Sequence, residues 1–369
     1  MCDSIRIMKG HSHVTKHCLL ITGLMLAISL NALSLVSGGG YTLAQTIPAQ
    51  LTDQQFWKIS SESSEEDGSF RSDNLLSNEY GFQNVLSDLT STVKPGRIYL
   101  GVGPEQNFTY IVAIKPKMVF IIDIRRGNLD LHLMYKALFE LSKDRAEFVS
   151  RLFARKRPDG LGTQSSAEEI FNAYATVQPG EALYNENLKA ILDHLTRKHG
   201  FGLSNKDQEG IEYVYANFYR FGPDINYNSS QNGGFGGGGN RVTYADLMTA
   251  TDDRGEPRSY LANEQNFAFL RELETKNMVV PVVGNFAGPK AIRAVGKYLK
   301  DLDATVSAFY LSNVEDYLNG TLWTDFCRNT ASLPLDQAST FIRTARGSGG
   351  GGMRSQLGNM VSDLLMCKE

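Results

Sequence analysis

Two glycines and a later aspartate form the chemically most specific pattern in this sequence. Gly101 and Gly103 follow a short apolar run, and Asp123 follows a second apolar run about twenty residues further on. Glycine lets the main chain turn sharply and lets a ligand approach it without a Cβ in between. An acid at that distance accepts hydrogen bonds from ribose hydroxyls in nucleotide-binding folds. The pattern therefore predicts a pocket for a ribose-bearing ligand, with a purely structural glycine turn as the alternative.

A ribose-bearing ligand without phosphate fits this pattern best. The dinucleotide fingerprint needs a third glycine, and bulky Phe108 stands near its place. Glu105 adds a negative charge at the start of the following helix, where a pyrophosphate would be repelled. S-adenosylmethionine is the usual ligand of this kind. The candidate cofactor-binding residues are Gly101, Gly103, Glu105, Asp123 and Arg125, the last of which flanks the same end of the sheet.

Alternating strands and helices must position these residues. Residues 98–100 and 118–122 are apolar runs typical of strands in a parallel sheet, and residues 105–115 have the spacing of a helix with one apolar face. Strand, helix, strand and strand follow later, at residues 278–283, 290–299, 304–311 and 340–342. This order predicts an α/β fold with a doubly wound, mostly parallel sheet.

The loops after the later strands complete the expected site. In a doubly wound sheet, ligands bind beyond the carboxyl ends of the strands. The residues that we expect to gather there, near Gly101 and Asp123, are Asn285, Phe286, Ser312, Asn313 and Glu315.

The motifs GVGPEQNFTYI, FIIDIRR, YADLMTATD and VPVVGNFAGPKAIRAVG resemble those of a family of uncharacterised bacterial proteins with a class I methyltransferase-like, Rossmann-type domain. The resemblance covers most of the chain after Trp57. It implies a sheet of the class I methyltransferase type, with Gly101 and Gly103 in the cofactor loop and Asp123 as the ribose acid. The chain departs from that class just before the glycine turn, where Tyr99 and Leu100 replace the usual acid.

Three functions stay open on this basis. The first is an S-adenosylmethionine-dependent methyltransferase of unknown substrate, with Asn285 or Glu315 at the methyl acceptor; its reaction would depend chiefly on positioning, because a sulfonium already activates the methyl group. The second is an exported, non-catalytic Rossmann-like protein that binds a ligand or a partner. The third and weakest is an NAD(P)-dependent oxidoreductase, which the missing third glycine disfavours.

The first 44 residues have the pattern of a targeting segment. A basic head with Arg6, Lys9 and Lys16 precedes an apolar run at residues 18–36, and Ala44 offers a cleavage point. The pattern predicts a secretory signal, with an uncleaved membrane anchor as the alternative. The rest of the chain is then periplasmic or extracellular and contacts the membrane only through this segment. Such a location conflicts with the first function, because free S-adenosylmethionine is a cytoplasmic metabolite.

The remaining segments divide the chain into a linker region (45–95) and an α/β domain (96–369) with a helical insertion. The polar residues 45–69 predict a solvated linker and residues 74–89 a short helix. The interruption at about residues 144–240 predicts a helical insertion or cap, which ends in a mobile glycine-rich loop at 233–239. After it, residues 241–249 are expected to form a strand and 252–255 a turn. A linker at 347–352 and a terminal helix at 353–366 are expected to end the chain.

Charge and cysteine content limit the partners. The formal net charge of −3 gives no reason to expect nucleic acid. Cys327 and Cys367 lie in the exported part, where a disulfide is expected if they are close enough. These two distant cysteines have no paired histidine, so no metal site is expected. His132, a single histidine on a helix, is interpreted as structural. The sequence leaves the oligomeric state open.

Overall fold

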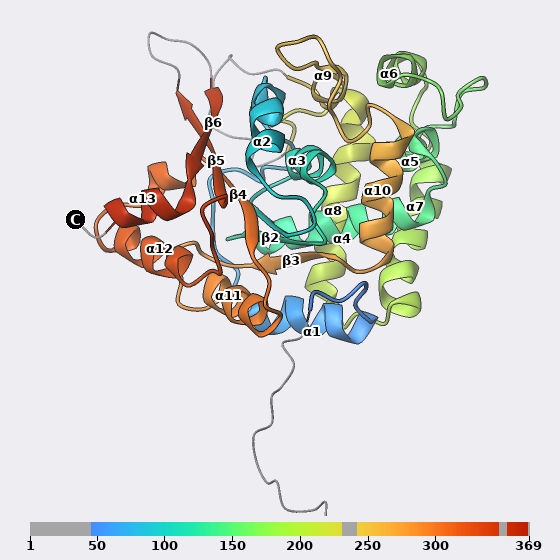
Figure 1. Cartoon of the computed structure of the whole chain (residues 1–369). Helices are drawn as coiled ribbons and strands as arrows, with labels where there is room; N and C mark the ends of the chain where they lie inside the picture. Colours follow the sequence, from blue (N-terminus) through green and yellow to red (C-terminus); the bar gives the residue numbers. More distant parts are fainter. Residues whose placement is uncertain (1–45, 231–241, 347–352, 368–369) are drawn as a thin grey trace, which may run out of the picture. The chain divides into compact units, whose positions relative to one another are not determined.

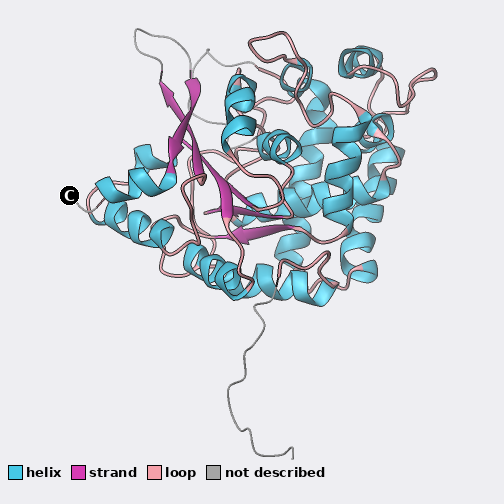
Figure 2. Cartoon of the chain, viewed as in Figure 1, coloured by secondary structure: helices cyan, strands magenta, loops and turns pink. Residues whose placement is uncertain are grey.

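A six-stranded sheet forms the centre of the protein (Figures 1 and 2). The computed structural model describes residues 46–230, 242–346 and 353–367. The strands, in spatial order, are β3 (Val279–Val283), β2 (Met118–Asp123), β1 (Ile98–Gly101), β4 (Val306–Ser312), β5 (Thr340–Arg346) and β6 (Met353–Asn359). Only the β5–β6 pair is antiparallel. The prediction of a mostly parallel α/β sheet is therefore confirmed.

The strand sequences explain this architecture. Every residue of β1, β2 and β3 is buried, as expected for apolar strands covered on both faces. Between β1 and β2, α3 (Gln106–Ile114) ends at Lys115, which takes a left-handed conformation before Pro116. Proline disfavours the helical conformation in the residue before it, so the helix stops where the sequence predicted.

Helices cover both faces of the sheet. One set of mutually contacting helices consists of α3, α4 (Arg126–Leu141) and α10 (Glu264–Thr275). The other set consists of α1 (Asp53–Ser63), α11 (Ala291–Asp301) and α12 (Thr321–Ala331). The chain crosses the sheet from β1 to β3 in one direction and returns past β1 to β4 and β5 in the other. Crossovers of the same hand then put the two sets on opposite faces, which is the doubly wound arrangement.

The predicted helical insertion is confirmed. It contains α5 (Arg145–Leu152), α6 (Ala167–Ala175), α7 (Glu181–Asp193), the π-helical turn η2 (His194–Lys198), α8 (Asn205–Phe221) and the short η3 (Gly222–Asp224). The helix α8 packs along α4, and Figure 1 shows the insertion gathered beside that helix rather than over β5 and β6. The glycine-rich loop, the leader and the 347–352 linker lie outside the described residues.

The predictions for two segments that precede β3 in the chain are wrong. Residues 53–63 are the helix α1 rather than a solvated linker; a capping box of Thr52 and Gln55 starts it, and Phe56 is fully buried. Residues 244–249 form the helix α9 (Tyr244–Thr249) rather than a strand. Thr243 and Asp246 make a capping box there, which outweighs the strand-like alternation of the sequence.

Other boundaries also differ from the sequence prediction. The expected terminal helix at 353–366 is half strand, because β6 pairs with β5 before α13 (Met360–Met366) begins. Residues 74–81 are not helical, and only η1 (Phe82–Val85) and α2 (Leu86–Thr92) follow them. The expected turn at residues 252–255 is confirmed, since the Gly255 amide donates to the Asp252 carbonyl.

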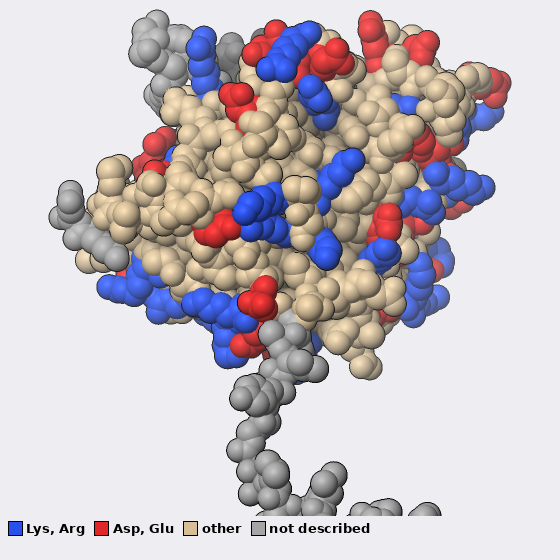
Figure 3. Space-filling view, viewed as in Figure 1, with Lys and Arg blue, Asp and Glu red and all other residues tan. Residues whose placement is uncertain are grey.

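A disulfide joins Cys327 in α12 to Cys367 after α13, as the sequence suggested for an exported domain. No helix in the described ranges has both the length and the apolar character needed to cross a membrane. Figure 3 shows Lys and Arg side chains interspersed with Asp and Glu over the face drawn, in keeping with the small net charge. The expectation that nucleic acid is not a partner stays a prediction.

Candidate functional site

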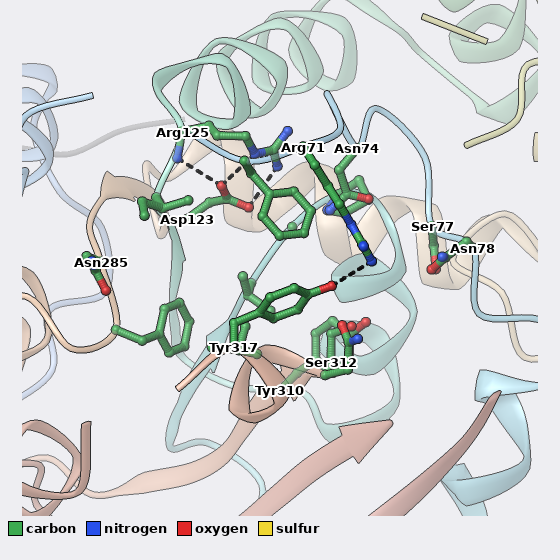
Figure 4. A pocket seen from close by; sticks show the side chains of 18 of the residues that line it. Arg71, Asn74, Ser77, Asn78, Asp123, Arg125, Asn285, Tyr310, Ser312 and Tyr317 are labelled. Atoms are coloured by element: carbon green, nitrogen blue, oxygen red, sulfur yellow. Dashed lines mark hydrogen bonds and ion pairs between the residues drawn. The ribbon is translucent and has the colours of Figure 1, made fainter. Parts of the chain in front are cut away.

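A cavity of about 370 Å³ lies at the carboxyl ends of β1, β2, β3 and β4 (Figure 4). It opens where the strand order reverses between β1 and β4, the position at which doubly wound sheets bind ligands. The residues that carry its chemistry are Arg71, Asn74, Glu79, Gly103, Asp123, Arg125, Asn285, Phe286, Tyr310, Ser312, Asn313 and Tyr317. Asn285, Phe286, Ser312 and Asn313 were predicted to gather near Gly101 and Asp123; all four line the cavity together with Asp123, but Gly101 does not line it.

Asp123, the predicted ribose acid, lies in the wall of this cavity and is held by Arg125. The Arg125 side chain donates from Nε to Oδ1 (3.0 Å) and from Nη2 to Oδ2 (2.9 Å), and its backbone amide also donates to Oδ1. Arg125 in turn donates to the carbonyls of Ser72 and Asp73. A carboxylate has about four acceptor positions, so Asp123 can still accept a hydrogen bond from a ligand at Oδ2.

The two glycines have different roles. Gly103 lines the cavity and has a φ of +75°, which favours glycine. Gly101 does not line it, and a Cβ there would lie 1.9 Å from Oδ1 of Asn107. The Asn107 side chain donates to the carbonyls of Val102 (2.9 Å) and Pro104 (2.8 Å) and so fixes the turn. The prediction that Gly101 contacts the cofactor is therefore not supported, because its space is filled by Asn107.

Glu105 and His132 lie beneath the turn rather than in the cavity. Glu105 is fully buried, and burial raises the pKa of its carboxyl to about 8, so it is mostly neutral below that pH. His132 donates from Nε2 to the Gly103 carbonyl (2.8 Å), and burial lowers its pKa to about 4. The structural interpretation of His132 is confirmed, whereas Glu105 does not line the cavity as a cofactor-binding residue would.

Residues 64–79, which were predicted as linker up to residue 69 and as helix from residue 74, cross the carboxyl ends of the strands, and we call this segment the strap. The Glu65 carboxylate accepts the amides of Asn285 (3.0 Å), Lys290 (2.8 Å) and Ala291 (2.8 Å) at the start of α11. Asp67 accepts the amide of Arg126 (2.8 Å) at the start of α4. The strap carboxylates thus occupy the helix N-termini that would otherwise attract a phosphate.

Glu79, at the end of the strap, lines the cavity and was missed by sequence reasoning. Its carboxylate accepts Nε2 of Gln106 (2.9 Å), Oγ1 of Thr344 (2.6 Å) and Oγ of Ser312. These contacts join α3, β5 and β4. No local pattern marks such a residue, because its partners lie up to 265 positions away.

Aromatic side chains form much of the remaining wall. Arg71 of the strap donates to the hydroxyl of Tyr317 (2.9 Å), and these two side chains meet across the cavity in Figure 4. The ring of Phe70 stands edge-on to Tyr317, with centroids 5.4 Å apart. Deeper in the cavity, Phe286, which follows β3, stacks on Phe309 of β4. The cavity therefore combines flat apolar surfaces with a few charged groups, as small-molecule sites usually do.

Of the two residues predicted to contact a methyl acceptor, Asn285 lines the cavity and Glu315 does not. Asn285 lines the cavity, and its Oδ1 accepts the amide of Ala287 (2.9 Å). Glu315 lies in the short helix η4 (Val314–Tyr317), does not line the cavity, and is bonded to Arg343 (2.6 Å). Glu315 was expected beside the site because it follows β4, but Arg343 of β5 holds it outside the lining.

The family model described as Domain of unknown function (DUF7790) matches residues 75–210 and 240–360. These two stretches contain Glu79, Gly103, Asp123, Asn285 and Ser312 of the cavity. The strap up to residue 74 lies outside them. No curated protein matches the chain.

Proposed function

We propose that this chain, which belongs to the family described as Domain of unknown function (DUF7790), binds a ribose-bearing small molecule without phosphate in the cavity. S-adenosylmethionine is the ligand that we propose. The observation that carries the proposal is the Asp123 carboxylate in the wall of a 370 Å³ cavity, beside Gly103 and at the switch point of the sheet.

The ribose accounts for Asp123. A ribose hydroxyl would donate to Oδ2, which accepts only Nη2 of Arg125, because Oδ1 already accepts both the backbone amide and Nε of Arg125. Arg125 fixes the orientation of the carboxylate before the ligand arrives. Such preorganisation lowers the entropy cost of binding.

The other parts of the ligand have matching groups. Phe286 and Tyr310 offer flat surfaces against which an adenine ring would pack. Arg71 lines the opening, and no ion pair links it to a carboxylate among the residues that the structure describes. A ligand carboxylate, such as the one on the methionine part, would pair with it.

Phosphate-bearing cofactors fit less well. Glu65 and Asp67 already accept the free amides at the starts of α11 and α4. A pyrophosphate would have to displace these carboxylates or lie beside them, at an electrostatic cost. An NAD(P)-dependent oxidoreductase therefore remains the weakest candidate.

Methyl transfer is the reaction proposed for the bound ligand. The sulfonium already activates its methyl group, so the protein needs chiefly to align an acceptor with it. Asn285 remains the candidate contact for that acceptor, because Glu315 does not line the cavity. The substrate stays unassigned.

The second candidate function is an exported, non-catalytic ligand-binding protein with the same cavity. The observation that favours it is the disulfide between Cys327 and Cys367, because disulfides persist mainly in oxidising compartments. Alkylation of free thiols in lysates of the native host, with fractionation, separates the two candidates. A cytoplasmic pool with both thiols free supports the methyltransferase, and an exported, fully oxidised pool supports the binding protein.

Calorimetric titration tests the shared ligand proposal. We expect one molecule of S-adenosylmethionine, or of its demethylated product, to bind per chain. Asp123→Asn should weaken binding about tenfold or more, which corresponds to roughly 1.4 kcal/mol. Arg71→Gln, at the exposed opening, should also weaken binding, and it tests the proposal if Asp123→Asn disturbs folding. The matched control is Asp301→Asn on the exposed side of α11, which should leave the affinity unchanged. The absence of heat at millimolar ligand would contradict the proposal, as would equal affinities in all variants.

A further inference from the structure

Three side chains far from the cavity converge on one point. Glu140 lies in the last turn of α4, and His194 and His199 lie at the start and just after the end of η2. Nε2 of His194 is 2.8 Å and Nε2 of His199 is 2.9 Å from Oε2 of Glu140. The three side chains are only 3%, 8% and 6% exposed, respectively. Their ligand atoms all lie within 4.8 Å of one another, close enough to share a metal ion.

The π-helical turn brings the two histidines together. Residues five positions apart point in different directions on a regular α-helix, which has 3.6 residues per turn. Here the amide of His199 donates to the carbonyl of His194 (3.0 Å), the i→i+5 bond of a π-helix. Both imidazoles consequently face Glu140. Such π-turns are rare and occur frequently at functional sites.

His199 also has the outer partner that a metal-binding histidine usually has. Its Nδ1 bonds to Oδ1 of Asp53 (2.6 Å) at the start of α1, and Asp53 accepts a further bond from Asn277 (2.8 Å). A carboxylate on the second ring nitrogen fixes the tautomer and the orientation of a metal-bound imidazole. In this arrangement, Nε2 of His199 is left to face Glu140.

Positive charge already gathers at this point. Nζ of Lys198 lies 3.3 Å from Oε2 of Glu140 and 3.4 Å from Nε2 of His194, and its side chain is 60% exposed. The buried Lys136 pairs instead with the other oxygen of Glu140, Oε1 (2.7 Å). Burial alone would raise the pKa of Glu140, but hydrogen bonds from the histidines and the charge of Lys136 hold it well below its usual range. An incoming cation must displace Lys198, which can turn into solvent, and the Nε2 protons that the two histidines donate to Glu140.

We propose that Glu140, His194 and His199 bind a zinc ion that joins α4 to the helical insertion, with Asp53 of α1 as the outer partner of His199. Two imidazole nitrogens and one carboxylate oxygen are ligands typical of zinc. Tetrahedral ligands at 2.0–2.1 Å from the metal are about 3.3 Å apart, so each nitrogen–oxygen distance must open by about 0.5 Å. A water molecule on the Lys198 side completes the coordination.

The site is separate from the proposed ligand cavity. Asp53 lies beside Asn277, which precedes β3, whereas Oγ of Ser64, at the other end of α1, accepts the amide of Val283, where β3 ends (3.0 Å). The cluster is therefore at the amino end of the sheet, opposite the cavity. No metal site was expected from the sequence because its two distant cysteines, Cys327 and Cys367, have no paired histidine. The ligands escape local patterns, since Glu140 and His194 are 54 positions apart.

Zinc analysis of the full-length chain tests the proposal. The leader contains His11, His13 and His17, so all variants carry glutamine at these three positions and a tag without histidine. After equilibrium dialysis against micromolar zinc, we expect one zinc per chain by mass spectrometry of the metal. His194→Gln and His199→Gln should each lose this zinc. Asp53→Asn should weaken it about 10- to 100-fold.

Lys198→Gln provides the sharpest distinction from a purely structural ion-pair cluster. Removing the competing ammonium should tighten zinc binding, whereas Lys189→Gln, an exposed lysine of α7 that pairs with Asp193, should leave it unchanged. Circular dichroism checks that each variant is folded, and neither lysine change removes a buried group. Absence of stoichiometric zinc from the parent would overturn the proposal. Retention of zinc by both histidine variants would do the same.

Discussion

At the scale of single residues, Gly101 leaves space for the side chain of Asn107, which stabilises the glycine turn. The position predicted to contact a ligand therefore has a structural role. Gly101→Ala would bring a Cβ within 1.9 Å of Oδ1 of Asn107. The Asn107 side chain must then move away from the carbonyls that it caps. We expect the free energy of unfolding to fall by about 2–4 kcal/mol. Urea unfolding measures it, and Gly127→Ala is the control because no atom lies near its added Cβ. Equal midpoints for the two variants would show that the close approach is not limiting.

Glu105 gives the protein a predictable pH dependence. Burial raises its pKa to about 8 in the folded protein, above the ordinary value of 4.5. Between these values the folded state binds more protons than the unfolded state, so stability falls as pH rises. This group contributes at most about 1.4 kcal/mol per pH unit to that fall. It contributes fully below about pH 4.5 and no longer above about pH 8.

Glu105→Gln removes this titration but keeps a neutral side chain of the same shape. We expect the stability difference, variant minus wild type, to increase steadily from pH 5 to pH 8. Urea unfolding at four pH values gives this difference, with the exposed Glu209→Gln as the control. A difference that does not change with pH would mean that Glu105 is charged in the folded protein.

Candidate site residues were predicted from their position just after a strand. The prediction holds where the strand alone determines where the side chain lies. Asp123, Asn285 and Ser312 line the cavity because parallel strands end at one edge. The prediction for Glu315 was wrong because Arg343 of β5 bonds to its carboxylate outside the cavity lining. Glu79 and the zinc ligands were missed because long-range contacts, not local spacing, create their environments.

At the scale of elements, the strap shows how a polar segment becomes ordered. Glu65 accepts three amides around the start of α11, so Glu65→Gln should lower the free energy of unfolding by about 1–2 kcal/mol. Hydrogen exchange at Asn285, Lys290 and Ala291 should become faster in the variant. The neighbouring exposed Glu66→Gln is the matched control. Unchanged exchange at these amides would contradict the capping role of Glu65.

The disulfide gives a second test at this scale. It closes a loop of 40 residues between α12 and the segment after α13. Reduction should lower the free energy of unfolding by about 2–4 kcal/mol. Urea unfolding with and without reductant measures the loss, and the double variant Cys327→Ser, Cys367→Ser should be insensitive to reductant. An identical stability of oxidised and reduced wild type would contradict a stabilising role.

The elements that were mispredicted share a physical cause. Capping boxes start both α1 and α9, and in each case a run judged by hydrophobicity alone predicted no helix. The strand β6 was predicted as helix because its pairing with β5, rather than its own residues, makes it a strand. Local capping was readable in the sequence, whereas the pairing of an edge strand was not.

At the scale of the whole molecule, the alternation of strands and helices that builds the mostly parallel sheet was the most predictable feature. Apolar runs alternating with helices led to the parallel sheet and to the edge at which the cavity lies. The strap over that edge and the zinc cluster at the opposite edge both depend on α1 and its neighbours packing against distant parts of the chain. Together these features describe a sheet with a proposed ligand site at one end and a proposed metal site at the other.

The most direct test of the central claim is a crystal structure of the protein grown with millimolar S-adenosylhomocysteine, the demethylated product of the proposed ligand. We expect density in the cavity, with a ribose hydroxyl within hydrogen-bond distance of Oδ2 of Asp123 and the adenine against Phe286 or Tyr310. A ligand bound elsewhere, or a cavity still without it at that concentration, would contradict the account.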